Sequence, residues 1–592
     1  MLKRFFLNSL SSFVGAWVAI LLFIVGGVVF VLGIIGSAAT GDVAKLSRHS
    51  IMKIVLGGAI EETESATPFN YTFFLSGGIE KPQTLRTLVD ALEKAKNNSN
   101  IDALYIECSG ASASPATFNA LRNAVIDFKK SGKRVFAYGD NLSMGDYYVA
   151  TAADVVYLNP AGSLDLQGIN GTALYFKGLL DKIGIEVQTV RVGTFKSAVE
   201  PYTSNEMSEP ARLQLDTLYS TMWNYILDGV AKARNVEPSE INSLVDNFLF
   251  LDDAPVVKKH NLVDDCLYYR QVVDAMAEYV GEDSEDLNFV SPDLVLGNRN
   301  YNPGVNKQIA VLYAVGDIAE FEGAGIDCHT LVPIIVGLAE NEDVHGLVLR
   351  VNSPGGSVFG SEQIGEALDY FKSKGKPLAV SMGDYAASGG YWISAGADRI
   401  FADPLTITGS IGIFGMVPNV EKLAHNLGVY PQAVGTNPGV QFPSIFFPMS
   451  PQQESALQQN VERGYEKFVS RVAQGRHKSP EYIKTIAEGR VWSAIRAQEL
   501  GLVDQLGSLQ EAVDWVATKA SVSNPNVVCY PAPDNTIWDI LSMASGNMSA
   551  DVRTIMNRLQ AESTDRQMLQ TVWWFINQNP LQARAPFYHI VF

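Results

Sequence analysis

Cysteine is scarce in this chain of 592 residues, and its cysteines are widely separated: Cys108, Cys266, Cys328 and Cys529. No CxxC pair and no HExxH pattern occurs, so we predict no metal site and no cofactor. We interpret the four thiols as isolated buried side chains. A disulfide between two of them is the alternative if the main body is extracytoplasmic. The sequence also lacks the GxxxxGK[ST] pattern of a nucleotide-binding P-loop.

An excess of positive charge is absent as well. The formal net charge is −18, whereas a nucleic-acid-binding protein normally presents a basic surface. We therefore expect no nucleic-acid partner. The hydrophobic content of 47% indicates a folded chain rather than long disorder, and its length requires two or more domains.

Long apolar runs are rare, with one exception near the amino terminus. Residues 13–35 form an uncharged run of about 23 residues, and a helix of about 20 residues crosses the hydrocarbon core. Lys3 and Arg4 precede this run, so the positive-inside rule places the amino terminus in the cytoplasm and the body on the far side. A cleaved signal peptide is the alternative, because small residues follow the run. The apolar core of a signal peptide is usually shorter, about 7–15 residues, so we predict an uncleaved anchor.

Two parts of the chain repeat each other. Five pairs of short segments match in the same order, beginning with YGD at 138–140 and MGD at 382–384, an offset of 244 residues. The last pair is NLVDD at 261–265 and GLVDQ at 501–505, an offset of 240. An offset that drifts so little over this span indicates two tandem domains.

Both halves alternate short apolar runs with amphipathic stretches. The runs IAVLYAV, HGLVLRV, PLAVSM and DRIFAD resemble buried strands. In the stretch 361–375, Ile364, Leu368 and Phe371 recur at helical spacing, and Gly375 ends the predicted helix. This alternation predicts an α/β fold built from parallel βαβ units.

The predicted organisation has five parts: a cytoplasmic segment 1–12, a transmembrane anchor 13–35, an N-terminal domain 55–290, a C-terminal domain 305–520 and an extension 521–592. The extension matches neither half and carries many aromatic residues near its end. We interpret it as packing against a core or a neighbouring subunit, with contact to a membrane surface as the alternative.

Three glycine-flanked elements lie close together in the second half. Residues 349–368 read as a strand, a glycine-rich turn and a helix, with Ser357 near the helix cap. DYAASGGYWISAGAD at 384–398 carries Ser388, and TITGSIGIFG at 406–415 carries Ser410. Taken one at a time, each of these elements could be a structural turn.

Together, the strings NSPGGSV, AASGGYW and TGSIG resemble the signal peptide peptidase A family, serine–lysine peptidases of the Clp/crotonase superfamily. The resemblance covers nearly the whole chain, including the anchor and the tandem halves of the long form. It implies tandem Clp/crotonase-like domains and makes Ser410 the nucleophile. The GTFKSAVEPY string implies Lys196 as the general base. The resemblance also suggests the amides of Gly355 or Gly356 as oxyanion donors.

The repeat supplies an independent check on this pair. The VGT register aligns Lys196 with Pro438, and the AD…P register aligns Ser410 with Leu166. Each half therefore lacks the residue that the other supplies, which predicts a composite site. Burial between the halves would lower the pKa of the lysine and leave a neutral amine to accept the serine proton.

Three alternatives remain open. A Clp-type triad on Ser388 requires a histidine about 25 residues later, and that region has none, so Ser388 is more simply a packing residue that lines the site. A crotonase-type acyl-transfer enzyme would need acyl-CoA outside the cytoplasm. A membrane-tethered scaffold without activity is the third alternative.

The family resemblance also implies partners and location. It suggests cleaved signal peptides or similar apolar peptides as substrates, and a homotetramer. The uncharged stretch 439–449 offers apolar surface for such chains, with a core strand or interface as the alternative. The implied location is the bacterial inner membrane, with the body in the periplasm.

Overall fold

The described part of the chain comprises several ranges of a computed structural model: 46–63, 83–297, 307–321, 325–437, 439, 441–531, 581–584 and 590–591. They belong to one compact unit by their contacts. The predicted segment 1–12, the anchor 13–35 and most of the extension 521–592 lie outside the described residues. Among the helices that are described, none is long and apolar enough to cross a membrane.

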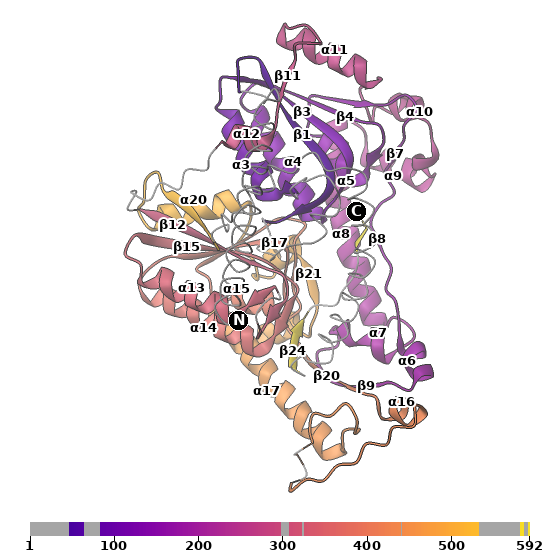
Figure 1. Ribbon diagram of the computed structural model, residues 1–592, viewed down its shortest axis with the longest axis vertical. Helices are drawn as coiled ribbons and strands as arrows, with labels where there is room; N and C mark the ends of the chain where they lie inside the picture. The colour runs from indigo at the N-terminus through magenta and orange to yellow at the C-terminus, as the bar shows by residue number, and fades with distance from the viewer. Residues whose placement is uncertain are drawn as a thin grey trace, which may run out of the picture. The chain divides into compact units, whose positions relative to one another are not determined.

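The first half is organised around a parallel sheet. Its seven strands include β2 (Gln83–Thr84), which pairs with β1. The others follow the order β10 (Asp265–Cys266), β6 (Val155–Leu158), β4 (Arg134–Gly139), β3 (Ile101–Ser112), β1 (Ser50–Glu61) and β11 (Asn288–Val290). Every ladder of this sheet is parallel, as the βαβ pattern predicted. Figure 1 shows this sheet in its upper part, with β1, β3 and β4 in indigo and violet and β11 in magenta.

The second half repeats this plan. Its sheet follows the order β21 (Val491–Ser493), β19 (Ile407–Gly409), β17 (Leu378–Ala387), β15 (Val344–Ser353), β12 (Gln308–Val315) and β23 (Asn526–Tyr530). Two further strands are attached to it, β18 (Arg399–Ala402) and β22 (Gln505–Leu506). The four apolar runs predicted as strands are β12, β15, β17 and β18. β23 lies beyond residue 520, where we expected the extension to begin.

Helices pack beside these sheets, and one of them, α14, lies in the stretch 361–375 whose spacing predicted a helix. α3 (Leu85–Lys96), α4 (Pro115–Lys129) and α5 (Met144–Ala150) belong to the first half, and α13 (Cys328–Glu340), α14 (Val358–Ser373), α15 (Gly389–Ser394) and α20 (Leu509–Lys519) to the second. In α14 the residues Ile364, Leu368 and Phe371 are buried, as their spacing predicted. Ser357 caps α14, because its Oγ accepts a hydrogen bond from the Gly360 amide at 3.1 Å.

A third, smaller sheet joins segments from distant parts of the sequence. It runs β14 (Ile326–Asp327), β13 (Ile318–Ala319), β16 (Gly355–Ser357), β24 (Leu581–Arg584), β20 (Ile413–Asn419) and β9 (Glu186–Val192). β9 comes from the first half, yet it pairs along its whole length with β20 of the second. Figure 1 shows β9 beside β20 at the lower right, far from the other first-half strands.

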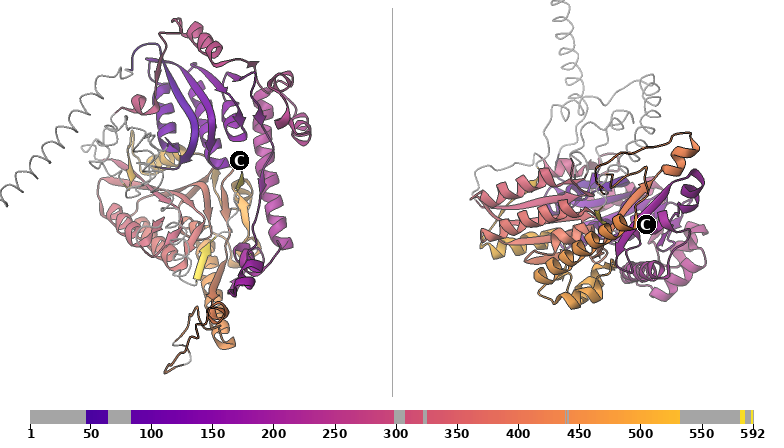
Figure 2. Two further views of the ribbon diagram at one scale, coloured as in Figure 1. Left: turned by 45° about the vertical axis from the view of Figure 1, so that its right-hand side comes forward. Right: turned by 90° about the horizontal axis from the view of Figure 1, so that it is seen from below.

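Long helices accompany this exchange of segments. α8 (Glu209–Arg234) begins soon after β9 and packs against β21 of the second sheet, and α17 (Pro451–Gly475) packs against β9 and β20. The left view of Figure 2 shows α8 running alongside elements of both halves. The apolar core of the first half also includes Leu405, Ile407 and Val491 from the second. The halves therefore interpenetrate instead of meeting at one flat surface.

Candidate active site

The ladder between β9 and β20 determines where the two predicted catalytic residues lie. The strands are antiparallel, with Val192 opposite Ile413 at one end. Lys196 follows shortly after β9, and Ser410 shortly precedes β20. Because antiparallel partners bring the end of one strand to the start of the other, both residues lie at the same end of the ladder.

The side chains of Lys196 and Ser410 meet there. Lys196 Nζ is 3.1 Å from Ser410 Oγ and 3.1 Å from the Ser410 carbonyl oxygen. Lys196 Nζ also donates to Ser388 Oγ at 2.7 Å. All three side chains are 0% exposed. The structure thus brings the predicted pair together across the two halves and places Ser388 beside it.

Burial changes the acid–base character of Lys196. It holds the pKa of this amine well below the ordinary value of 10.5, because desolvation disfavours the charged form. The hydrogen bonds found for Nζ in the described part of the chain go to neutral serine oxygens, which do not oppose this shift. A neutral amine next to a serine hydroxyl is the arrangement that base-assisted attack requires.

A short loop from the second half, residues 488–490, contacts the segment that carries Lys196. Phe195 N donates to the Glu488 carbonyl at 2.9 Å, and Ser410 N donates to the Arg490 carbonyl at 2.7 Å. Gly489 lies between them with φ of +74°, and a Cβ there would come within 2.6 Å of Lys196 Cβ. Its carbonyl oxygen is 3.3 Å from Ser410 Oγ. The loop contacts both members of the pair and has room only for glycine at this point.

One positioning residue, Gln214 on α8, was not predicted from the sequence. Its Nε2 donates to the Phe195 carbonyl at 3.2 Å and to Ser197 Oγ at 3.1 Å, and its Oε1 accepts from Val491 N at 3.3 Å. Gln214 therefore connects the lysine segment to the second half and is itself 1% exposed. No sequence signal distinguishes it from other polar residues of a long amphipathic helix.

The two serines share an uncommon backbone conformation. Ser388 has φ of 55° and Ser410 has φ of 52°, in a region that non-glycine residues rarely occupy. Ser388 N donates to the Gly409 carbonyl at 2.8 Å, which joins the two turns. Backbone strain of this kind occurs at functional sites where the surrounding structure imposes the conformation.

The glycines predicted as oxyanion donors form β16. Gly355 has φ of +107° and Gly356 has φ of +154°, and a Cβ on Gly356 would come within 2.1 Å of the Ile318 carbonyl oxygen. Close approach of β13 therefore requires glycine at this position. The amide of Gly355 donates to Ser353 Oγ at 3.1 Å.

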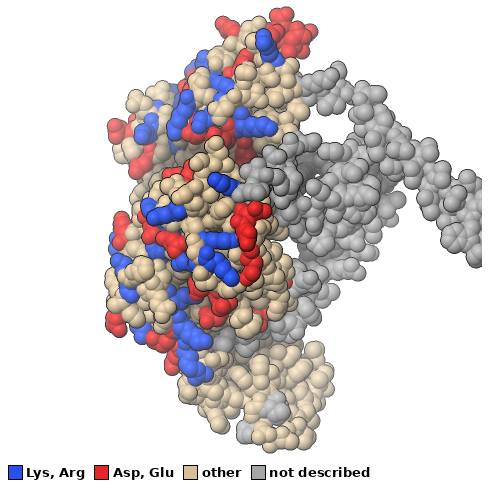
Figure 3. Space-filling model, turned by 90° about the vertical axis from the view of Figure 1, so that its left-hand side faces the viewer, with Lys and Arg blue, Asp and Glu red and all other residues tan. Residues whose placement is uncertain are grey.

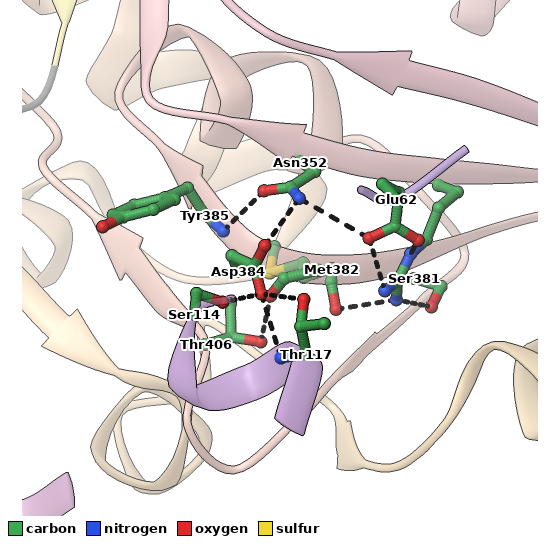
Figure 4. Close-up of polar contacts among 11 residues, drawn as sticks. Glu62, Ser114, Thr117, Asn352, Ser381, Met382, Asp384, Tyr385 and Thr406 are labelled. Atoms are coloured by element: carbon green, nitrogen blue, oxygen red, sulfur yellow. Dashed lines mark hydrogen bonds and ion pairs between the residues drawn. The ribbon is translucent and has the colours of Figure 1, made fainter. Parts of the chain in front are cut away.

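Buried polar contacts fix the docking of the halves near the site (Figure 4). Asp384, on β17 a few residues before Ser388, accepts hydrogen bonds from the first half at the start of α4. The donors are Ser114 Oγ, Thr117 N at 3.1 Å and Thr117 Oγ1 at 2.8 Å. α4 has no cap from its own Ser114 side chain, so Asp384 serves as its acceptor from the other half.

A second contact in the same region is an ion pair. Arg350 on β15 binds both carboxylate oxygens of Glu62, at 2.8 Å and 3.1 Å. Arg350 also donates to Ser381 Oγ and to the Met382 carbonyl, so the guanidinium is well supplied with acceptors (Figure 4). Both partners are buried, and breaking such a pair leaves an uncompensated charge. Neither Glu62 nor Asp384 was predicted to contribute to the site.

The comparisons with known proteins agree with the tandem organisation. Residues 127–282 and 370–523 each match the sequence profile of peptidase family S49. The two matches begin 243 residues apart and end 241 apart, within the offsets found in the sequence.

The chain belongs to peptidase family S49. Protease 4 of Salmonella typhi is 34% identical over 80% of this chain and 77% of its own length. Protease 4 of Haemophilus influenzae is 36% identical over 74% of this chain and 73% of its own length. A putative signal peptide peptidase SppA of Enterococcus faecium is 31% identical over 44% of this chain and 76% of its own length. This S49 chain is accordingly a serine peptidase, as its sequence predicted.

Proposed function

We propose that this S49 peptidase is an endopeptidase with a Ser410–Lys196 dyad assembled from both halves. The observation that carries the proposal is the distance of 3.1 Å between Lys196 Nζ and Ser410 Oγ in a fully buried setting. In this mechanism the neutral amine accepts the Ser410 proton while Oγ attacks a peptide carbonyl. The resulting ammonium donates that proton to the departing amine, and water then hydrolyses the acyl-enzyme.

In the same proposal, Ser388 is a positioning residue. Its Oγ accepts from Lys196 Nζ at 2.7 Å and holds the amine at the end of the β9–β20 ladder. The amide of Gly355 becomes an oxyanion donor when it exchanges Ser353 Oγ for the substrate oxygen. The halves themselves are proposed to be Clp/crotonase-like domains, which the parallel sheets flanked by helices support.

We infer apolar peptides, including released signal peptides, as substrates. The name of the Enterococcus relative and the composition of one surface support this. No Asp, Glu, Lys or Arg occurs between 423 and 453, and the exposed side chains there include Leu427, Tyr430 and Val434. Figure 3 shows the corresponding lower lobe without red or blue side chains. An uncharged, partly apolar surface suits apolar chains or a membrane boundary.

We further propose that residues 13–35 anchor the protein in the bacterial inner membrane, with the body in the periplasm and a homotetramer as the assembly. The uncharged run supports the anchor, the bacterial relatives support a bacterial location, and the family resemblance supports the tetramer. Crosslinking of the membrane-embedded protein followed by mass measurement tests the assembly. Protease added to the periplasmic side of intact spheroplasts tests the orientation.

Labelling with a fluorophosphonate, followed by mapping of the modified residue, tests the dyad. We expect the label on Ser410, with loss of both label and peptidase activity in Ser410→Ala. Ser388→Ala should weaken labelling without moving it, whereas the control Ser394→Ala on α15 should retain it. A label on Ser388, or full activity in Ser410→Ala, would overturn the proposed mechanism.

A further inference from the structure

The third sheet contains a strand from a remote part of the chain, directly beside the proposed site. β24 lies between β16 and β20 and is antiparallel to both. β16 carries the proposed oxyanion glycines, and β20 starts shortly after Ser410. One end of β24 therefore lies near Ser410 and the proposed oxyanion glycines.

The pairing of β24 is specified on both sides. Arg584 is opposite Gly355 on β16, and Gln582 is opposite Phe414 on β20. Extending the β20 register by two residues brings Arg584 opposite Gly412, next to the serine turn. β24 therefore runs toward Ser410 as an extended peptide, which is how a peptide binds when it adds a strand to a sheet.

The side chain of Arg584 on β24 has a specific partner. Its Nη2 donates to Asp317 Oδ2 at 2.7 Å, in the turn between β12 and β13. The side chains are 14% and 30% exposed, respectively. Burial raises the pKa of Asp317 and lowers that of Arg584, so both groups have lost solvent on pairing. In a partly desolvated setting, such a pair discriminates between charged and neutral side chains more strongly than a surface pair does.

We propose that Asp317 is a specificity determinant that selects a basic side chain in an extended peptide bound between β16 and β20, and that Arg584 of the same chain occupies this subsite in competition with substrate. The proposal rests on the proposed peptidase function and adds the side chain that the site selects. A peptide with Lys or Arg next to an apolar stretch supplies the basic side chain that this subsite selects. Signal peptides have that composition, because a basic segment precedes their apolar core.

The test of selectivity uses the full chain and apolar fluorogenic peptides that differ at one residue, which is Arg or its neutral isostere citrulline. The residue is moved through the positions flanking the cleaved bond. We expect kcat/KM to favour Arg by about tenfold at one position, which corresponds to about 1.4 kcal/mol. Asp317→Asn should reduce this ratio to about one, whereas Asp317→Glu should retain a preference for Arg. The control Asp181→Asn, which removes an exposed carboxylate paired with Lys177 on α6 (Lys177–Ile183), should keep the native ratio.

The competition by the chain itself is tested at Arg584. Arg584→Gln removes the charge that fills the subsite, so KM for the Arg peptide should fall several-fold. Arg584→Lys should restore a KM near the native value. An unchanged KM in Arg584→Gln, or an unchanged Arg preference in Asp317→Asn, would overturn the corresponding part of the proposal.

Failure of the subsite and failure of the proposed function give different results. If Ser410→Ala is inactive while Asp317→Asn keeps the native ratio, the dyad stands and the subsite is wrong. If Ser410→Ala remains active while the ratio collapses in Asp317→Asn, the subsite stands and the nucleophile is wrong.

Discussion

The two halves carry different residues at the equivalent position near the start of the helix that follows the central strands. At the offset of 244 residues, Gly390 of the second half corresponds to Asp146 of the first. The Asp146 carboxylate accepts hydrogen bonds from the amides of Gly110 at 2.8 Å and Ala111 at 3.2 Å. The first half thus occupies the backbone amides at the end of its strand β3 with its own side chain. In the second half a Cβ at Gly390 would lie 2.7 Å from the Ser353 carbonyl oxygen, so this closely packed position admits only glycine and carries no side chain that could bind the neighbouring amides.

The neighbouring positions differ in the same direction. Met144 and Leu166 of the first half correspond to Ser388 and Ser410, and both are buried apolar residues in the first core. The first half has therefore kept the scaffold and filled the site, while contributing Lys196 through β9. In the proposed mechanism, the first half supplies the lysine that the second half lacks.

The largest effect is expected at Lys196. Lys196→Met keeps the length of the side chain and removes the amine, so peptidase kcat should fall by about 10³-fold or more. Lys182→Met, at an exposed position on α6, should leave kcat unchanged. Steady-state assays on both variants check this, and substantial activity in Lys196→Met would show that the second half works without its partner.

The pH profile should report the same lysine. Its pKa lies well below 10.5 in the folded protein, so the neutral fraction at a given pH is larger than for a free lysine. The kcat/KM should stay high at pH values below 10.5 and fall as the pH drops through the lowered pKa. Measurement of kcat/KM against pH, and of fluorophosphonate labelling against pH, should show the same acid limb. A limb near 10.5 would contradict a buried base.

Alanine substitutions at Gly489 and Gly428 distinguish the effect of contact with Lys196 from the effect of backbone strain. Gly489→Ala introduces a Cβ that would come within 2.6 Å of Lys196 Cβ, and it also strains a residue with φ of +74°. Gly428→Ala has nearly the same strain, with φ of +79°, but no atom within 4 Å of its Cβ. We expect Gly489→Ala to lose about 10²-fold in kcat, and Gly428→Ala to cost about 1 kcal/mol of stability with native kcat. Equal kcat in the two variants would show that the loop does not position Lys196.

Asp384 and Asp140 occupy equivalent positions and allow a matched test of docking. Asp384→Asn weakens the contacts to Ser114 and Thr117, so the free energy of unfolding should fall by about 1–3 kcal/mol. Asp140 bonds Tyr138 and Asn159 within its own half and is exposed, so Asp140→Asn should cost about 0.5–1 kcal/mol. Urea unfolding followed by circular dichroism measures both. A larger loss of unfolding free energy for Asp140→Asn than for Asp384→Asn would contradict the role of Asp384 in docking the two halves.

The last prediction concerns Asp146 and the dependence of stability on pH. Burial raises its pKa from 3.8 to about 6, so between these values the folded state binds a proton that the unfolded state releases. Stability from this group is therefore complete below pH 3.8 and is lost as the pH rises to about 6, by roughly 3 kcal/mol in total. Asp146→Asn should remove that component from the plot of unfolding free energy against pH. An identical slope in the variant would mean that the carboxylate is not buried.

The sequence predicted the parts of the site that have local signals. Ser410 and Lys196 lie in short motifs, and the reciprocal losses at Leu166 and Pro438 indicated that the halves must combine. The buried strands and α14 followed from apolar periodicity.

Other features depend on tertiary contacts that no local pattern encodes. Gln214 functions through three partners in two halves, and Asp384 caps a helix that is 270 residues away in the sequence from its own position. The insertion of β9 into a sheet of the second half was equally invisible, because strand propensity does not identify a pairing partner.

The exchange of β9 has a consequence for the order in which the protein becomes active. Lys196 is synthesised 214 residues before Ser410, and the loop at Gly489 that holds both comes later still. A growing chain that ends before Ser410 therefore lacks the proposed nucleophile, the partner strand of β9 and part of the first half's apolar core. With the proposed dyad, peptidase activity can begin only after the loop at Gly489 has been synthesised.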